Sequence, residues 1–318
     1  MQSTIVSVQN LSKTYAGKKA VDRLDFNIRR SEFFGLLGPN GAGKTTTIGM
    51  LTGLIPPSEG NIFIDALDVS VHALDVKAKI GFVPQDFAFY PTLSAKDNLL
   101  FFGRIYGLHG KQLKQQIGKS LKAVELLENA GDPVATFSNG MKRRLNIAIG
   151  MLHNPQILIL DEPTVGVDAH VRRVILENLQ TLNQKGLTIL LTTHHLEEAQ
   201  QLCHRVAIMD KGKIIAIEKP SALIAALGNG IVRVCFSGPI PALLKEEMEK
   251  LGKVVLPDSS IAHILSGPAG PDTIIQSLRS STKVAPVSIK RLIILEPNLE
   301  TVFLHLTGRP PDIDGQLL

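Results

Sequence analysis

The stretch Gly38-Pro39-Asn40-Gly41-Ala42-Gly43-Lys44-Thr45-Thr46 decides the fold of this chain. It follows the apolar run 33–37 and precedes a segment of helical character, so the order is strand, glycine loop, helix. A loop with the spacing G-x-x-x-x-G-K-T wraps a phosphate chain in backbone N–H groups and points a helix N-terminus at the same anion. Lys44 supplies a positive charge for the outer phosphates, and the Thr45 hydroxyl is a ligand for Mg²⁺. The stretch therefore predicts a nucleoside triphosphate site.

A second apolar run, residues 157–160, ends in two carboxylates, Asp161 and Glu162. Such a run is typical of a strand buried on both faces of a parallel sheet, and open α/β sheets bind ligands at the carboxyl ends of their strands. Asp161 is suited to hold Mg²⁺ through water, and Glu162 to polarise an attacking water. A helix cap explains one acid, but it explains poorly why both follow a buried strand beside a phosphate loop.

Four further features fit an anion site less specifically. Ser138, Asn139 and Gly140 open a predicted helix, and serine and asparagine are good caps, so this is a second helix N-terminus able to face an anion. His194 follows a predicted strand at 187–191 and is in a position to contact the γ-phosphate, although a lone histidine at such a place is usually a core or surface residue. Gln85 lies near the end of a predicted strand at 80–86, and Tyr15 lies at a predicted hairpin tip, where packing is the usual role.

Composition bounds the remaining possibilities. The 318 residues, 44% of them hydrophobic, suffice for one large domain and a small one, or for two of middling size. The net charge of +5 suits an anionic ligand or membrane surface but is too small to indicate nucleic-acid binding. Cys203 and Cys235 lack metal or redox spacing, as expected in a reducing compartment. The chain has no signal-peptide pattern and no run of 18 apolar residues, so we expect a cytoplasmic protein unless a partner holds it elsewhere.

Two regions outside the phosphate loop have their own patterns. A predicted amphipathic helix at 111–129 places Ile117, Leu121, Val124 and Leu127 inward. After about residue 220, short strands and helices alternate in a β-α-β-β-α-β order that predicts a small α+β module. An aromatic cluster gathers near the middle of the chain and is either a local core or a docking surface for another protein. Its members are Phe82, Phe87, Phe89, Tyr90, Phe101, Phe102 and Tyr106.

With Tyr15, the glycine loop, Gln85, the Ser-Asn-Gly helix start, Asp161-Glu162 and His194 in this order, the chain resembles the ATP-binding subunits of ABC transporters. The resemblance is strongest to stand-alone ATPase subunits of the drug-export, ABC-2 type branch. It covers residues 3–220 strongly and the rest weakly. It implies an α/β P-loop NTPase of ABC ATPase type, with a mixed sheet core, an antiparallel β subdomain and a helical subdomain. The expected domains are 1–220 for ATP binding, with helices at about 86–152, then 221–308 as an accessory module and 309–318 as a tail.

The resemblance also implies roles for individual residues. Tyr15 would stack on adenine, and residues 38–46 would be the Walker A loop. Gln85 would touch Mg²⁺ and pass a signal to the helical subdomain. Asp161 would be the Walker B aspartate and Glu162 the catalytic base. Asp168 matches the D-loop aspartate, and His194 matches the switch histidine. His194 is preferred to His195 because Glu197-Glu198-Ala199 follows it at the family's distance.

The helix start at Ser138 departs from the family's L-S-G-G-Q signature, because Asn139 replaces a glycine. Asparagine adopts the left-handed conformation more readily than other non-glycine residues, so we expect the loop shape to survive. Its side chain is expected to crowd a phosphate contact and to reduce turnover. In the family, two ATPase domains pack head to tail, so each nucleotide lies between Walker A of one copy and the signature of the other. ATP and Mg²⁺, a second ATPase subunit (expected to be a homodimer) and a separate integral membrane permease are thereby implied, with no nucleic acid.

Two other functions compete with export. Soluble ABC ATPases that act on ribosomes or DNA usually carry two ATPase domains or a long coiled-coil insertion, and this chain has neither. An importer ATPase is disfavoured by the C-terminal module and by Met141 in the signature. In the family, the segment after Gln85 receives the coupling helices of the permease, which favours the docking interpretation of the aromatic cluster. We therefore expect an export ATPase held by a partner at the cytoplasmic face of the membrane, with a substrate that the sequence does not specify.

Overall fold

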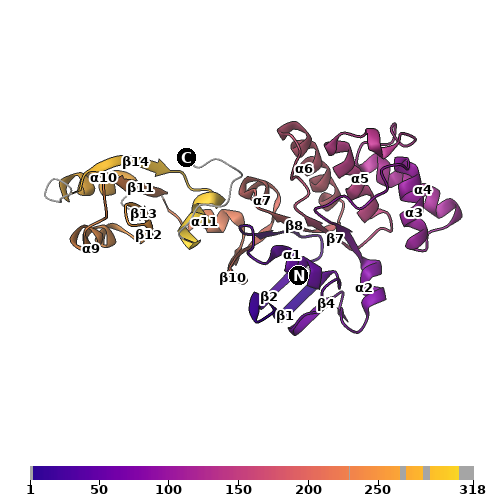
Figure 1. Cartoon of the computed structure of the whole chain (residues 1–318), viewed down its shortest axis with the longest axis horizontal. Helices are drawn as coiled ribbons and strands as arrows, with labels where there is room; N and C mark the ends of the chain where they lie inside the picture. Colours follow the sequence, from indigo (N-terminus) through magenta and orange to yellow (C-terminus); the bar gives the residue numbers. More distant parts are fainter. Residues whose placement is uncertain (1–2, 229, 266–269, 282–286, 308–318) are drawn as a thin grey trace. The chain divides into compact units, whose positions relative to one another are not determined.

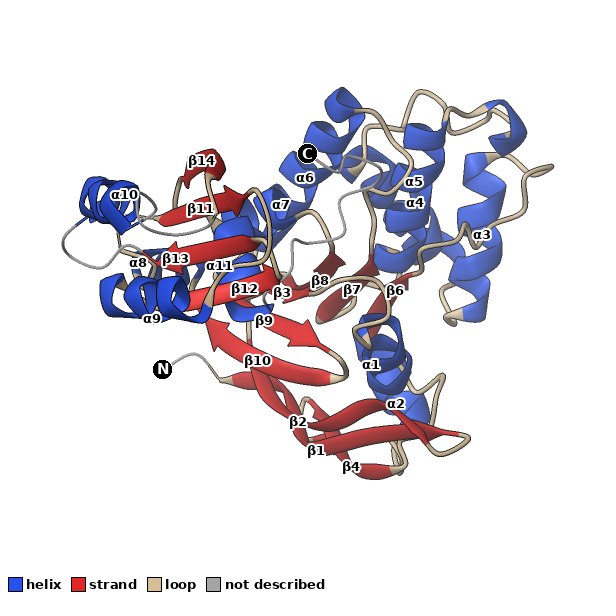
Figure 2. Ribbon diagram, turned by 60° about the vertical axis from the view of Figure 1, so that its left-hand side comes forward, coloured by secondary structure: helices blue, strands red, loops and turns tan. Residues whose placement is uncertain are grey.

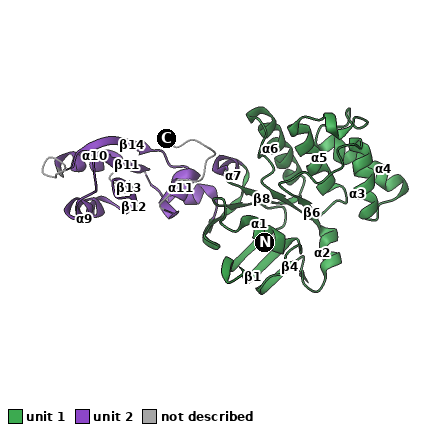
Figure 3. Ribbon diagram, in the orientation of Figure 1, with its two compact units in different colours: residues 1–194, 202–217 green, residues 195–201, 218–318 purple. Residues whose placement is uncertain are grey.

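The structure, a computed structural model, describes residues 3–228, 230–265, 270–281 and 287–307 (Figure 1). The chain divides into two compact units: residues 1–194 with 202–217, and residues 195–201 with 218–318 (Figure 3). Across the described ranges, no helix combines the length and the apolar character needed to cross a bilayer. The predicted tail at 309–318 lies outside the described residues.

A six-stranded sheet forms the centre of the first unit. Its strands lie in the order β10 (Lys213–Glu218), β9 (Arg205–Asp210), β3 (Phe33–Leu37), β8 (Thr188–Thr193), β7 (Ile157–Asp161) and β6 (Ile80–Val83). The five strands from β9 to β6 pair in parallel, so their carboxyl ends meet at one edge of the sheet. β3, β7 and β8 are buried along their whole length, as their continuous apolar runs predict for strands covered on both faces.

The first unit also contains an antiparallel sheet of four strands. Its strands are β2 (Lys18–Arg29), β1 (Thr4–Tyr15), β4 (Glu59–Ile64) and β5 (Leu67–Asp68). Helix α1 (Lys44–Leu51) lies between the two sheets (Figure 2), and its Ile48 and Met50 share one buried cluster with Val6 of β1 and Phe34 of β3. Because α1 begins at the glycine loop, burial on both sides holds that loop rigidly at the edge of the central sheet.

Helices make up the rest of the first unit. They are α2 (Ala73–Lys79), α3 (Ala95–Ile105), α4 (Gly110–Ala123), the single 3₁₀ turn η1 (Val134–Thr136), α5 (Asn139–Met151) and α6 (Ala169–Gln184). Ser94 caps α3 by accepting a hydrogen bond from the Asp97 N–H at 3.0 Å. α5 contacts α3, α4, α6 and β6, so it joins the helical region to the central sheet.

The amphipathic helix predicted at 111–129 is shorter than expected. α4 ends at Ala123, and Glu125 takes a left-handed φ of +55°, a conformation that a right-handed helix does not continue. Leu121 is buried as predicted, but Leu127 is 50% exposed. Helical spacing stops applying once the chain leaves the helix, so the inward placement of Leu127 was wrong.

The second unit contains the β-α-β-β-α-β module that the sequence predicted. Its elements are β11 (Ile231–Phe236), α9 (Ala242–Leu251), β12 (Val254–Asp258), β13 (Ile261–Leu265), α10 (Gly270–Ser281) and β14 (Ile289–Leu295). The antiparallel sheet has the order β12-β13-β11-β14. α9 and α10 cover one face, where Val232 and Ile264 meet Met248 and Leu278 in one buried cluster.

Three more helices belong to the second unit: α7 (Leu196–Leu202), α8 (Pro220–Ala225) and α11 (Leu299–Thr307). α8 contacts α11, and the Leu299 N–H donates to the Gln200 side-chain oxygen at 2.9 Å. α7 therefore groups with the C-terminal elements, although its sequence position precedes the boundary expected near residue 220.

His263 is an unusual buried residue of this module. It lies on β13 opposite Arg233 of β11 and is 3% exposed. Neither ring nitrogen accepts or donates a hydrogen bond within the described part of the chain. Burial lowers the pKa of His263 to about 4, the Arg233 cation acts in the same direction, and the Asp258 carboxylate opposes both. The ring is therefore neutral in the folded module at neutral pH.

We expect His263 to make the second unit sensitive to acid. Its folded pKa of about 4 lies below the ordinary 6.5, so the unfolded chain takes up the proton first. No stability is lost above about pH 7, and about 3 kcal/mol is lost as the pH falls from about 6.5 to about 4. Amide hydrogen exchange of β11 and β13, corrected for intrinsic rates, measures this loss. His263→Leu should lose less stability than the wild type over the same pH range, and equal losses would contradict the assignment.

Candidate active site

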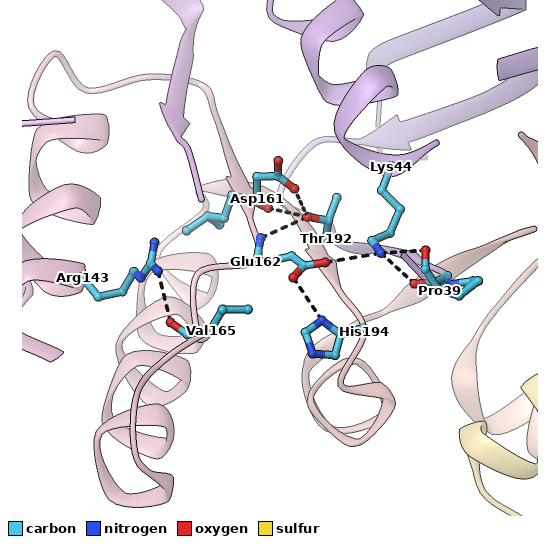
Figure 4. A network of polar contacts seen from close by, with 10 residues as sticks. Pro39, Lys44, Arg143, Asp161, Glu162, Val165, Thr192 and His194 are labelled. Atoms are coloured by element: carbon cyan, nitrogen blue, oxygen red, sulfur yellow. Dashed lines mark hydrogen bonds and ion pairs between the residues drawn. The ribbon is translucent and has the colours of Figure 1, made fainter. Parts of the chain in front are cut away.

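The carboxyl ends of four neighbouring strands bring the central predicted residues together (Figure 4). The glycine loop at 38–46 follows β3, His194 follows β8, and Asp161 and Glu162 lie at the end of β7. β3 pairs with β8, β8 with β7, and β7 with β6, whose end leads to Gln85. The arrangement is the one that open α/β sheets use for ligands.

The glycine loop requires glycine at its last turn. Gly43 precedes α1 with a left-handed φ of +106°, and a Cβ there would lie 2.6 Å from the Ala20 carbonyl oxygen. Any other residue would therefore displace the start of α1. Asn40, Gly41 and Thr45 are exposed, so the outer surface of the loop and the first turn of α1 are open to a ligand.

Lys44 is the buried cation of the site. Its Nζ donates to the Gly38 carbonyl at 2.7 Å and to the Pro39 carbonyl at 3.2 Å, and it lies 3.3 Å from Oε1 of Glu162. The side chain is 5% exposed, so these interactions are shielded from solvent. The loop thus places the positive charge of Lys44 beside its own backbone carbonyls and beside Glu162, which follows β7.

Glu162 is held on both sides. Its Oε2 lies 3.0 Å from Nδ1 of His194, and its backbone N–H donates to the Thr192 carbonyl and hydroxyl oxygens at 3.1 Å each. Burial raises the pKa of Glu162, but the His194 hydrogen bond and the Lys44 cation outweigh it, so the pKa is lowered overall. The carboxylate is therefore ionised at neutral pH. The Glu162 backbone has a φ of +48°, which is uncommon for a residue with a Cβ.

Asp161 lies one residue earlier and has a separate partner. Its Oδ1 accepts a hydrogen bond from the Thr192 hydroxyl at 2.6 Å, and its side chain is 3% exposed. Thr192 is thus a site residue that the sequence did not reveal, since it contacts both acids of β7. Its position at the end of a buried strand was visible, but its register opposite Asp161 was not.

Three predicted residues, Ser138, Asn139 and Asp168, lie exposed at helix starts. Ser138 caps α5 by accepting from the Met141 N–H at 3.2 Å, and Asp168 caps α6 by accepting from the Val171 N–H at 2.9 Å. Asn139 is the first residue of α5 and does not adopt the left-handed conformation, so the helix start does not depend on that preference of asparagine. The expected crowding of a phosphate by its side chain stays a prediction.

Gly140 is required for helix packing and not for a special φ. A Cβ at this position would lie 2.3 Å from Cγ1 of Val171, so α5 and α6 approach too closely for any side chain. Tyr15, the predicted adenine platform, is 46% exposed at the hairpin tip, with Nζ of Lys13 5.2 Å from its ring centre. Its ring is open to a ligand on the surface of the antiparallel sheet.

A cleft of about 820 Å³ lies away from these residues, at the amino ends of the central strands. It is lined by Ser31 before β3 and by Gln156 before β7, together with Lys122 and Lys185. The two lysines lie at the C-terminal ends of α4 and α6, where a cation offsets the partial negative charge of the last carbonyls. This role accounts for the lysines without a ligand.

Comparison with known proteins agrees with this geometry. Residues 21–165 match the family model of the ABC transporter. The linearmycin resistance ATP-binding protein of Bacillus subtilis (strain 168) is 40% identical over 308 residues, covering 96% of this chain and 99% of the relative. The Nod factor export ATP-binding protein I of Sinorhizobium fredii (strain NBRC 101917 / NGR234) is 39% identical over 310 residues, covering 96% and 86%.

Solved structures share the fold of the first part of the chain. An ATP-binding subunit of an ABC transporter superposes with a TM-score of 0.64 at 28% identity, covering 70% of this chain and 93% of that one. A post-hydrolysis dimer of an ATP-binding cassette with ADP and Pi gives 0.62 at 29% identity, covering 68% and 98%. The fold is thus the P-loop ABC ATPase fold expected from the sequence. By its relatives over nearly its full length, this chain belongs to the ABC transporter family and is one of its ATP-binding, ATP-hydrolysing subunits.

Proposed function

We propose that this chain binds and hydrolyses Mg-ATP at a head-to-tail dimer interface and thereby powers export through a separate integral membrane permease. The observation that carries the proposal is the buried Lys44–Glu162–His194 network beside the glycine loop. It brings an ionised carboxylate, a histidine and a buried lysine together at one edge of the sheet, which supports the proposal. Residues 1–220 would form the ATP-binding domain, and residues 221–308 an accessory module.

The glycine loop would hold the triphosphate. The N–H groups of residues 38–46 would surround the β- and γ-phosphates, with Lys44 adding its charge. The exposed ring of Tyr15 would stack on adenine. Asp168, at the start of α6, and Ser138, Asn139 and Gly140, at the start of α5, would complete the nucleotide contacts.

The donor set at the loop fits magnesium. Thr45 offers an exposed hydroxyl, Asp161 a carboxylate and Gln85 an amide oxygen, all of them the hard oxygen ligands that Mg²⁺ prefers. No group of three or more His, Cys, Asp or Glu side chains suited to a metal occurs in the described part of the chain. That agrees with magnesium held by one or two carboxylates together with substrate phosphates. When bound, Mg²⁺ would neutralise charge on the phosphate oxygens.

Hydrolysis would use Glu162 as the general base. Its carboxylate, ionised because its pKa is lowered, would accept a proton from the attacking water. The water oxygen would bond to the γ-phosphorus as the bond to the β–γ bridging oxygen breaks, releasing ADP and phosphate. His194 would orient the carboxylate through its 3.0 Å contact and approach the γ-phosphate, and Gln85 would help to position the water and metal.

The site would be completed by a second chain. Ser138 and Asn139 are exposed at a helix start of α5, whereas Lys44 and Glu162 lie at the carboxyl edge of the central sheet. In a head-to-tail dimer, the start of α5 from one copy and the glycine loop of the other would face the same triphosphate. We propose a homodimer, in which ATP closes the interface and hydrolysis reopens it.

The permease would dock on the aromatic surface formed by Phe87, Tyr90, Phe101 and Tyr106, each 39–47% exposed. The Tyr90 and Phe101 rings pack edge to face with centroids 5.0 Å apart, so part of an apolar patch faces solvent. Exposed patches of this kind mark protein interfaces. The chain would thus be cytoplasmic and peripheral to the membrane through this partner. The name of the Nod factor export relative favours export over import or action on nucleic acid.

Purification from detergent extract tests the proposal. We expect the tagged chain to bring down a polytopic membrane protein. Phe101→Asp should abolish this recovery because it places a charge in the apolar patch, while ATP binding persists. The matched control is Leu74→Asp on α2, a leucine that is 83% exposed outside the patch and should leave recovery unchanged. Recovery of ribosomal proteins or DNA in place of a membrane protein would overturn the export function.

A further inference from the structure

The loop that carries Gln85 is bound along its backbone by one side chain of α5. Asn146 donates from Nδ2 to the Pro84 carbonyl at 3.2 Å and to the Asp86 carbonyl at 3.4 Å. Its Oδ1 accepts from the Ala88 N–H at 3.3 Å. Asn146 is 2% exposed, so these contacts are made out of solvent. The loop is thus tied to the helix on both sides of Gln85.

Arg143 lies one turn earlier on the same helix and donates to the Gln85 carbonyl, which lies between the two that Asn146 bonds. Its Nη1 donates to the Gln85 carbonyl oxygen at 2.6 Å. Its Nη2 donates to the Val165 carbonyl oxygen at 3.1 Å (Figure 4). The guanidinium carbon lies 4.8 Å from the ring centre of Phe87. One side chain therefore joins three segments: the loop after β6, the segment that leads to Asp168, and α5 itself.

The chemistry at this position requires arginine. Arg143 is 4% exposed, and burial lowers its pKa while the Asp86 carboxylate opposes that shift. A planar guanidinium donates in two directions at once and stacks on an aromatic ring, whereas a lysine ammonium is a compact point charge. Two separate nitrogens of the fork reach the two carbonyls. Arg144, the next residue, instead bonds the Val124 carbonyl at 3.2 Å and leaves the Gln85 loop alone.

We infer that Arg143 and Asn146 are positioning residues that keep Gln85 and residues 165–168 in a fixed relation to α5. The inference rests on the proposed roles of Gln85, Asp168 and the helix start at Ser138. A partner that moves the Gln85 loop then moves the start of α5 and the segment before α6 with it. The loop that faces the partner and the two segments that face the second copy act as one body.

The test compares Arg143→Met, Arg143→Lys and Asn146→Ala with the matched control Arg144→Met. We expect Arg143→Met to lower kcat for Mg-ATP by about 10- to 100-fold, because a small displacement of Gln85 misplaces the water and metal. ATP affinity without Mg²⁺ should stay within about twofold, since the glycine loop is untouched. Asn146→Ala should behave similarly, Arg143→Lys should fall between, and Arg144→Met should match the wild type.

Hydrogen exchange of the ATP-free protein gives a readout that does not depend on catalysis. Arg143→Met should speed exchange in residues 84–90 and 165–168 together, with β7 unchanged. The inference is overturned if only one segment responds, if kcat stays within about twofold of the wild type, or if kcat, magnesium-free ATP affinity and melting temperature all fall together. A wild-type protein without ATPase activity would overturn the proposed site instead, and the exchange result would still decide the linkage.

Discussion

Replacing Glu162 by glutamine is expected to lower kcat for ATP hydrolysis by about 10²- to 10⁴-fold, the usual contribution of a general base. The amide keeps the shape of the side chain and one oxygen near Lys44 or His194, which lie 3.3 and 3.0 Å from the carboxylate. It cannot take up the water proton. ATP should therefore bind without being cleaved, and the closed dimer should accumulate.

Phosphate release and gel filtration with Mg-ATP measure the two effects of Glu162→Gln. The matched control is Glu177→Gln on α6, an exposed glutamate 3.7 Å from Arg173, which should keep wild-type turnover and oligomeric behaviour. A Glu162→Gln protein that hydrolyses ATP at the wild-type rate would show that another group is the base. One that stays monomeric with ATP would count against the dimer.

Replacing Lys44 by methionine is expected to weaken ATP binding by about 10- to 150-fold, since a charge-assisted contact contributes about 1.5–3 kcal/mol. Methionine fills a similar volume in this 5% exposed position but carries no charge. The same change removes one of the two groups that lower the pKa of Glu162. The acid limb of the kcat profile should therefore move to higher pH, because Glu162 would then take up a proton more readily.

Nucleotide titration and a kcat–pH profile test the Lys44 prediction. Lys77→Met, on the exposed side of α2, is the control and should alter neither quantity. If Lys44→Met binds ATP as tightly as the wild type, the glycine loop alone supplies the affinity. If the acid limb of the kcat profile does not move, Lys44 does not lower the pKa of Glu162 in solution.

Features that depend on nearby residues were predicted well. The strand, loop and helix around Gly43 and the alternation of the C-terminal module appear as expected. Each follows from local conformational preference or from side-chain periodicity, which a short window of sequence contains. The predicted end of α4 was wrong because a single left-handed residue, Glu125, stops the helix while the apolar spacing of the sequence continues.

Features that depend on long-range register were not predicted. Thr192 meets Asp161 only because β8 lies beside β7 in that register, and Lys44 meets Glu162 across a separation that no local pattern encodes. Arg143 was not among the residues that the sequence singled out. Its role follows from the carbonyls that packing brings to it.

The sequence by itself determined the glycine loop, the two carboxylates after a buried strand, and a likeness strong enough to imply the family. These depend on residue type and spacing along the chain. Tertiary structure alone decided the ion pair and histidine around Glu162, and the attachment of the Gln85 loop to α5. A buried charge or amide must find a partner, and only the packed sheet and helices determine which atoms are near enough.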